Sequence, residues 1–208
     1  VVNVGAIENK GMEFSLDLKA ISTKDFQWNV AANISFDRNK VTRLYGNNTV
    51  VYNYDGDRNL QKEGNLFVGQ PRNTIFIWRT GGIAQQSDMA VLNTINWAGR
   101  SVNPGDLYPL DIAGPNGTGP DGKIDNLDDR VIVGSPDPKF YGGFSTDLSY
   151  KGIALNAVFN YSYGAKKLSY IYESMTGSTG RGLASLDLLD RWTPENTDAA
   201  YPRPIIND

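Results

Sequence analysis

The segment from Asp121 to Asp128 has the residue types and the spacing of a site for a hard metal ion. Calcium in proteins takes about six to eight oxygen ligands, with a glycine at the sharp turn of the loop and an acidic residue closing it. If Asp121 takes the fifth loop position, Gly122 falls at the turn, the carbonyl of Lys123 at the seventh position, Asp125 at the ninth and Asp128 at the twelfth. The spacing therefore predicts calcium bound by Asp121, Lys123, Asp125 and Asp128.

The first half of this loop departs from the calcium pattern. Positions one and three would be Gly117 and Gly119, which carry no side-chain oxygen, and the closing residue Asp128 is not the usual bidentate Glu. Without a metal, the same Gly- and Asp-rich stretch forms a turn stabilised by its own side chain–backbone hydrogen bonds. Both interpretations stay open on the sequence.

The amino-acid composition excludes most kinds of catalytic site. The 208 residues contain neither cysteine nor histidine, which removes disulfides, thiolate metal sites and the common nucleophile–histidine pairs. Asp55 and Asp57 are paired carboxylates, but nothing in the surrounding sequence supplies the protonated acid and cleft that glycoside hydrolysis needs. The formal net charge of −3 gives no basic footprint, so nucleic acid is not an expected partner. The sequence therefore predicts a protein that is not an enzyme.

Trp78 and Trp97 are the candidates for contact with a ligand or a partner. Both lie in a long stretch rich in Asn, Gly, Asp and Tyr, where exposed aromatic rings often mark binding surfaces. Such rings could stack on sugar units of a substrate. The alternative is that they pack the stretch onto itself or onto a partner protein.

Four segments alternate apolar and polar residues, and they must form the scaffold that carries these candidates. Because successive side chains of a strand point to opposite faces, each segment has one apolar face and one polar face. The segments pair into two hairpins, one joined by residues 22–25 and the other by Lys151-Gly152. Their length approaches the ~9–11 residues of a membrane-spanning strand and exceeds the ~5–6 of an ordinary strand. The segments are 12–20, 26–36, 140–150 and 153–163.

Two arrangements explain this alternation. A soluble β-sandwich also has strands with one solvated face. Strand length and the placement of aromatic residues favour a membrane barrel, since Phe26 and Trp28 begin one strand and Tyr161 and Tyr163 end another, as in the aromatic girdles of outer-membrane barrels. We therefore predict an all-β fold, a fragment of a large antiparallel transmembrane β-barrel with long extracellular loops.

The chain divides on this interpretation into four parts. Residues 1–44 and 140–164 are barrel hairpins, 45–139 is a long extracellular loop region, and 165–208 is a second extracellular loop. The second loop is expected to contain a short helix, because Leu183, Leu186, Leu189 and Trp192 have the spacing of one helix face before Thr193-Pro194. Four strands cannot close a barrel, so we expect the chain to be a piece of a longer polypeptide.

An ordered set of short strings resembles the C-terminal part of the SusC/RagA family, the TonB-linked outer-membrane receptors of Bacteroidetes. No string is decisive alone, but their order and spacing extend over nearly the whole chain. The strings are Asn9-Lys10-Gly11-Met12-Glu13, Phe26-Gln27-Trp28-Asn29, Asn39-Lys40-Val41, Val68-Gly69-Gln70-Pro71, Pro104-Gly105-Asp106, Asp121-Gly122-Lys123-Ile124-Asp125, Asp128-Asp129-Arg130, Phe140-Tyr141-Gly142-Gly143, Asp190-Arg191-Trp192-Thr193-Pro194-Glu195-Asn196 and Tyr201-Pro202-Arg203.

The resemblance implies a plugged barrel of about 22 strands in the bacterial outer membrane that imports oligosaccharides or peptides. It also implies a SusD-like surface lipoprotein as a lid, and contact with TonB through an N-terminal part that this chain lacks. Compared with the family pattern, Ile112–Pro120 resembles an insertion into the loop. Asp111 is then the candidate for the displaced first calcium ligand, and Asn116 is a second candidate. The rival interpretation is a soluble secreted β-domain that binds calcium and glycan.

Overall fold

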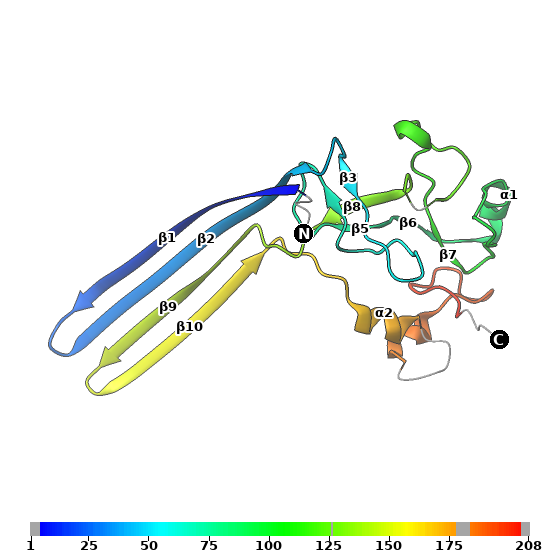
Figure 1. Cartoon of the computed structure of the whole chain (residues 1–208). Coiled ribbons are helices and arrows are strands. Elements are labelled where there is room, and N and C mark those ends of the chain that lie inside the picture. The colour runs from blue at the N-terminus through cyan, green and yellow to red at the C-terminus, as the bar shows by residue number, and fades with distance from the viewer. Residues whose placement is uncertain (1–4, 126, 178–183, 205–208) are drawn as a thin grey trace. The chain divides into compact units, whose positions relative to one another are not determined.

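The computed structural model describes residues 5–125, 127–177 and 184–204 (Figure 1). The chain forms two compact units. Unit 1 comprises Val1–Ile75 and Val133–Lys167, and unit 2 comprises Phe76–Ile132 and Leu168–Asp208. Parts of the predicted loop region, residues 45–75 and 133–139, thus fold together with the strands of unit 1.

The main element of unit 1 is a four-stranded antiparallel sheet with the strand order β1-β2-β9-β10. Both hairpin turns lie at the same end of this sheet (Figure 1). The two predicted hairpins are present, and β2 pairs with β9 although residues 45–139 separate them in the sequence. The strands are β1 (Gly5–Ser22), β2 (Phe26–Leu44), β9 (Phe140–Tyr150) and β10 (Ile153–Tyr163).

The strand register gathers the apolar residues of all four strands on one face. Phe14 pairs with Ile34, Ile34 with Gly142, and Gly142 with Tyr161. This apolar face is open: Phe14 is 58% exposed and Phe159 is 58% exposed. A sandwich would bury such a face against a second sheet. The open face is instead that of an antiparallel barrel segment, and the barrel is not closed within this chain.

Polar groups on the apolar face are satisfied by one another. The indole N–H of Trp28 donates to the hydroxyl of Thr146 at 2.8 Å, and the hydroxyl of Tyr161 donates to the carbonyl of Asn33 at 2.8 Å. The Tyr161 ring covers Gly142, where any Cβ would overlap both that ring and the Asn33 carbonyl. A side chain at Gly142 would therefore displace a tyrosine that links three strands.

The opposite face of the sheet is polar. The amide oxygen of Asn33 accepts the backbone N–H of Gly143 at 2.5 Å, and the amide of Asn156 donates to the carboxylate of Asp147. These pairs join β2 to β9 and β9 to β10, so side chains as well as backbone hydrogen bonds fix the sheet register.

A small core lies at the end of the sheet away from the turns. Val41 and Leu44 of β2 are buried, and the backbone of Val41 bonds to Gly69 and Gln70. The side chain of Asn39 donates to Asp137 at 2.6 Å and accepts from the backbone N–H of Arg72 at 2.7 Å. Two short strands, β3 (Val50–Val51) and β4 (Leu66–Phe67), pair beside this core.

Unit 2 is built mainly from irregular chain with a few short elements. β6 (Thr80–Ile83) pairs with β7 (Leu107–Pro109) within this unit. β5 (Ile75–Trp78) pairs with β8 (Arg130–Gly134), and both strands include residues of each unit. The helical elements are η1 (Gln86–Asp88), α1 (Met89–Leu92), η2 (Pro115–Gly117), α2 (Tyr170–Thr176) and η3 (Leu186–Asp190).

The predicted helix near the C-terminal end takes a different form in the structure. η3 is a five-residue 3₁₀ helix, and Leu186 and Leu189 are each 83% exposed instead of forming a buried face. Leu183 lies outside the described residues. Trp192 lies beyond the end of η3 and not on a helix face, and its indole donates to the side chain of Gln85 at 3.0 Å. α2 carries no periodic apolar pattern that would predict it; it begins after Ser169, whose side chain accepts the backbone N–H of Tyr172.

Among the described residues, no helix is long and apolar enough to cross a membrane.

Candidate functional site

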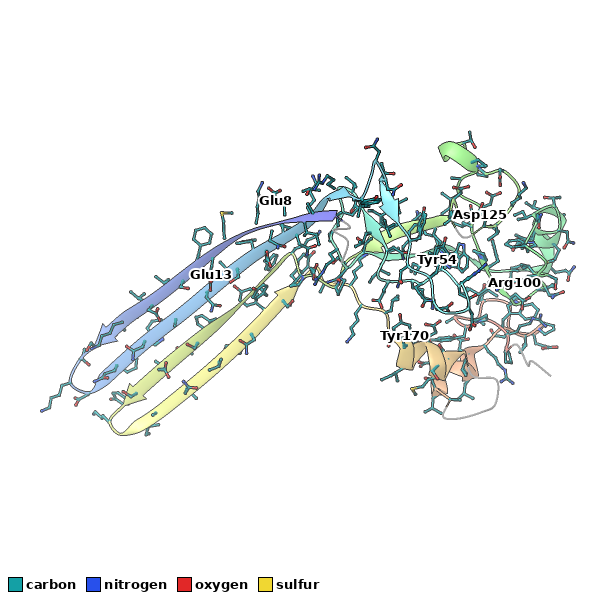
Figure 2. All side chains as sticks on the ribbon, in the orientation of Figure 1. Glu8, Glu13, Tyr54, Arg100, Asp125 and Tyr170 are labelled. Carbon is teal, nitrogen blue, oxygen red and sulfur yellow. The ribbon has the colours of Figure 1, made fainter. Side chains whose placement is uncertain are left out.

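A cavity of about 650 Å³ lies in unit 2, and the two predicted contact residues Trp78 and Trp97 both line it. Tyr108, Arg79, Arg100, Asp106 and Asp125 complete the part of the lining that carries rings and charges. Figure 2 labels Arg100 and also Asp125, another lining residue. The volume falls within the range of about 300–1,000 Å³ that is typical of ligand pockets. We call this site the aromatic cavity.

Pairing of β6 with β7 places Tyr108 in the cavity wall. The register shifts between Thr80 and Gly82, so Gly81 forms a bulge opposite Tyr108. The Tyr108 ring lies where a Cβ on Gly81 would be, and Gly82 has a φ of 112°. Both positions therefore require glycine, one for space and the other for backbone conformation.

Trp97 and Tyr108 form a rigid corner of the cavity. Their ring centroids are 6.2 Å apart and their planes meet at 81°. The indole N–H of Trp97 donates to the backbone carbonyl of Leu92 at 2.9 Å, which fixes the ring. Because this polar edge is already bonded, the indole offers only its apolar surface to a ligand.

Trp78 is fixed in the same way. Its indole N–H donates to the carbonyl of Asp125 at 3.0 Å, and the Arg130 guanidinium lies 4.1 Å from its ring centroid. This is a cation–π contact, and burial lowers the pKa of Arg130. The role of Trp78 and Trp97 in contacting a substrate or lid stays a prediction, although the structure brings both residues to one cavity.

The acidic side chains of the cavity wall already have partners. Asp106 accepts two hydrogen bonds from Arg203, at 2.6 and 3.2 Å, and one from the backbone N–H of Asn103 at 2.8 Å. Hydrogen bonding to Asp106 raises the pKa of Arg203. Asp125 accepts the backbone N–H groups of Leu127 and Asp128 at 2.7 and 2.8 Å.

The two arginines of the wall differ from these carboxylates. Arg79 and Arg100 are exposed, and neither guanidinium group makes a hydrogen bond or an ion pair within the described part of the chain. The cavity thus combines fixed aromatic surface with cationic groups that are available to a ligand.

The predicted calcium ligands form hydrogen-bonded turns in the structure. Asp111 accepts the backbone N–H groups of Asp121 and Gly122 at 3.2 and 2.7 Å, and Asp121 accepts that of Lys123 at 3.0 Å. Burial, with the nearby carboxylates of Asp125 and Asp129, raises the pKa of Asp128. Over the described residues, no three acidic side chains gather closely enough to hold a metal ion. Calcium binding stays a prediction from the sequence spacing, and the Asn116 side chain lies outside the described residues.

The residue that organises this segment is Asp129, which the sequence analysis did not select as a site residue. It is 1% exposed and accepts three backbone N–H groups, from Ile112 at 2.7 Å, Ala113 at 3.3 Å and Asp125 at 2.8 Å. Its occurrence in the Asp128-Asp129-Arg130 string was the available signal.

Three strings of the resemblance pack together in unit 2, those that contain Gly105, Trp192 and Arg203. The Trp192 ring lies where a Cβ on Gly105 would be, and the backbone N–H of Arg203 donates to the Gly105 carbonyl at 2.8 Å. The Asp106–Arg203 ion pair joins two of these strings. These motifs therefore hold unit 2 together and position the wall of the aromatic cavity.

Asp55, the other carboxylate considered for chemistry, stabilises a turn in unit 1. Its oxygens accept the backbone N–H groups of Asp57 and Asn59, at 3.0 and 2.8 Å, and the side-chain amides of Asn59 and Gln61. These bonds, led by that of the Asn59 backbone, lower its pKa. A general acid must carry a proton to donate, whereas these hydrogen bonds favour the ionised form of Asp55.

Comparison with known proteins gives a consistent result. No protein-family model matches the chain. The chain is 29% identical over its whole length to TonB-dependent receptor P3 of Formosa agariphila, and 29% identical over 97% of its length to receptor P26 of the same organism. It is 33% identical over 82 residues, 37% of the chain, to TonB-dependent receptor SusC of Bacteroides thetaiotaomicron. The chain spans 20% of receptor P3, 19% of receptor P26 and 8% of SusC.

Solved structures show the same fold. The RagAB peptide transporter matches 99% of the chain with a TM-score of 0.69 at 22% identity, and the present chain covers 20% of the matched RagAB chain. The RagAB importer in its "open-open" state matches 97% of the chain with a TM-score of 0.68.

The sequence relatives are named as TonB-dependent receptors and the solved structures as a peptide transporter and importer, and none of these names is that of an enzyme. The resemblance to the SusC/RagA family that the short strings carry is confirmed by the SusC relative and by the RagAB fold.

Proposed function

We propose that this chain is part of a TonB-dependent importer of the bacterial outer membrane. In this role β1, β2, β9 and β10 contact the lipid bilayer through their apolar face, and the polar face lines the lumen. The observation that carries the proposal is the open apolar face extending over all four strands, with Phe14, Leu155 and Phe159 each 58% exposed. Exposure of so large an apolar surface to water is unfavourable, whereas the hydrocarbon chains of lipids can cover it.

The proposed cargo is an oligosaccharide or a peptide, and the proposed partners are a SusD-like surface lipoprotein and TonB. Similarity to receptors named as TonB-dependent, SusC among them, supports this assignment. The solved structure with the same fold is that of a peptide transporter, which supports a peptide as the cargo. In this proposal TonB acts through a part of the receptor outside the present chain.

The proposed orientation places the two short turns in the periplasm and unit 2 outside the cell. Outer-membrane barrels combine short periplasmic turns with long external loops. The tight turns at 23–25 and Lys151-Gly152 lie at one end of the sheet (Figure 1), and this arrangement supports the orientation. The aromatic cavity then belongs to the external surface that cargo and lid would meet.

Growth and uptake test the proposed function. A strain that lacks the full receptor should lose growth on its cargo as sole carbon source, and should no longer take up fluorescently labelled oligosaccharide or peptide. Restoring the wild-type gene should restore both properties. Unchanged uptake of every oligosaccharide and peptide on which the parent strain grows would contradict the proposal.

Calcium at the loop of Asp111, Asp121, Lys123, Asp125 and Asp128 is a further part of the proposal. Terbium substitutes for calcium, and Trp78 can sensitise its luminescence because the indole bonds to the Asp125 carbonyl. Adding calcium should displace terbium and quench the signal. Asp125→Asn should abolish the signal, whereas Asp57→Asn, a change in the other Asp-rich turn, should preserve it. A signal that is absent in the wild-type receptor would leave the hydrogen-bonded turn as the correct account.

A further inference from the structure

We propose that the aromatic cavity binds a sugar unit that carries a negative charge, so that the cargo is an acidic oligosaccharide. This inference rests on the proposed import function and specifies its substrate class. It concerns a site formed by Trp78, Trp97, Tyr108, Arg79 and Arg100, all within unit 2.

The aromatic residues determine the shape of the ligand. Trp97 and Tyr108 meet at 81°, so together they form a corner that contacts one face and one edge of a six-membered sugar ring in its chair form. The indole N–H groups of Trp78 and Trp97 are bonded to Asp125 and Leu92. These rings can therefore hold a ligand only through their apolar surfaces, against which the C–H groups of a sugar ring pack.

The charged residues determine the sign of the ligand. Asp106 is paired with Arg203. One carboxylate oxygen of Asp125 accepts two backbone N–H groups, so Asp125 keeps its charge and is outnumbered by the two arginines of the wall. Arg79 and Arg100 make neither ion pairs nor side-chain hydrogen bonds with the described residues, and both line the cavity. A guanidinium group binds a carboxylate or sulfate through two parallel hydrogen bonds, so the cavity favours an anion.

The cavity fits an acidic sugar better than an acidic peptide. Extended peptides are commonly bound by adding a strand to an exposed sheet edge. The strand in the wall, β7, has only three residues and ends in Pro109, which has no N–H to donate. The wall thus offers little backbone for a peptide, whereas its rings and guanidinium groups suit a charged sugar.

The test is calorimetric titration of the full-length receptor with three probes of matched length: a galacturonic acid hexamer, maltohexaose and a hexaglutamate peptide. We expect the uronate hexamer to bind at least about tenfold more tightly than either of the others. Arg100→Gln and Arg79→Gln should each weaken uronate binding about tenfold, as loss of a charge-assisted pair predicts, and leave maltohexaose binding within about twofold. Arg58→Gln, a change at an exposed arginine of unit 1 that does not line the cavity, is the matched control and should change none of these affinities.

Several outcomes would overturn the inference. Equal binding of uronate and maltohexaose, tighter binding of the peptide, binding of none of the three, or full uronate binding in both arginine variants would each contradict it. Import is measured separately by growth and uptake. A receptor that imports neutral cargo but does not bind uronate would leave the proposed function intact and remove only this inference.

Discussion

The glycines of unit 2 show how single residues fix the cavity wall. Gly105 has a φ of 89° and lies under the Trp192 ring, and Gly81 lies under the Tyr108 ring. Each glycine lets an aromatic ring approach the backbone closely, and that contact links segments far apart in the sequence. The residue identities are therefore set by packing as well as by backbone conformation.

Gly105→Ala should destabilise unit 2 more than Gly99→Ala. Both glycines have a positive φ, 89° and 84°, which costs an alanine about 1–2 kcal/mol. Only at Gly105 does the new Cβ overlap a neighbour, and overpacking adds about 1–3 kcal/mol. Urea titration of the receptor, followed by tryptophan fluorescence, measures the difference. Equal losses in the two variants would show that Trp192 is not held against Gly105.

Tyr172 provides a prediction about pH. Its hydroxyl lies between the Tyr201 hydroxyl and the Asp187 carboxylate, and the Tyr201 hydrogen bond, burial and these neighbours raise the pKa of Tyr172 to about 12. Because the pKa is raised above the ordinary 10.0, this contribution to stability is complete below pH 10 and is lost as pH rises toward about 12. In the difference between ultraviolet titrations of wild type and Tyr172→Phe, one tyrosine should titrate near 12. Titration of that tyrosine near 10 would contradict the contact.

The sequence predicted only part of the candidate site. Trp78 and Trp97 were selected because exposed aromatic rings are recognisable in any loop. Tyr108, Arg79 and Arg100 were missed because their place in the cavity depends on the pairing of β6 with β7, which connects distant segments. Asp129 was missed because its three backbone partners are irregular chain that no periodic pattern marks.

At the scale of the elements, the alternation of apolar and polar residues was sufficient to predict β9 and β10. It also located β1 and β2, but the predicted segments were shorter than the strands. Pattern reading works where one face is apolar and the other polar. β1 and β2 continue as a pair beyond that region, where Asn9 pairs with Asn39 and Lys10 with Arg38. Strands that are polar on both faces carry no alternation, so the sequence could not show how far they extend.

The elements also carry the most direct test of which face meets lipid. Phe159 lies on the apolar face near the middle of β10, and its neighbour Asn160 lies on the polar face. Phe159→Lys should destabilise the barrel by about 2–4 kcal/mol, because a lysine near the bilayer midplane loses its hydration. Asn160→Lys should be nearly neutral. Urea unfolding of the receptor in lipid vesicles measures both values, and comparable losses would contradict the assignment of the faces.

At the scale of the whole molecule, unit 1 combines sequence segments that no local pattern connects. β2 and β9 pair across residues 45–139, and part of that stretch folds with them through the contacts of Val41 with Gly69 and Gln70. The relatives and the solved structures extend far beyond this chain, which covers 20% of receptor P3 and 20% of the RagAB chain. We therefore predict that the sheet is one sector of a larger closed barrel.

The most direct test of this account is the intact mass and the cellular fraction of the native polypeptide. We predict a polypeptide several times heavier than the 22.9 kDa chain, extracted by detergent from outer membranes together with a lipoprotein. A 22.9 kDa protein in the soluble fraction would contradict the account.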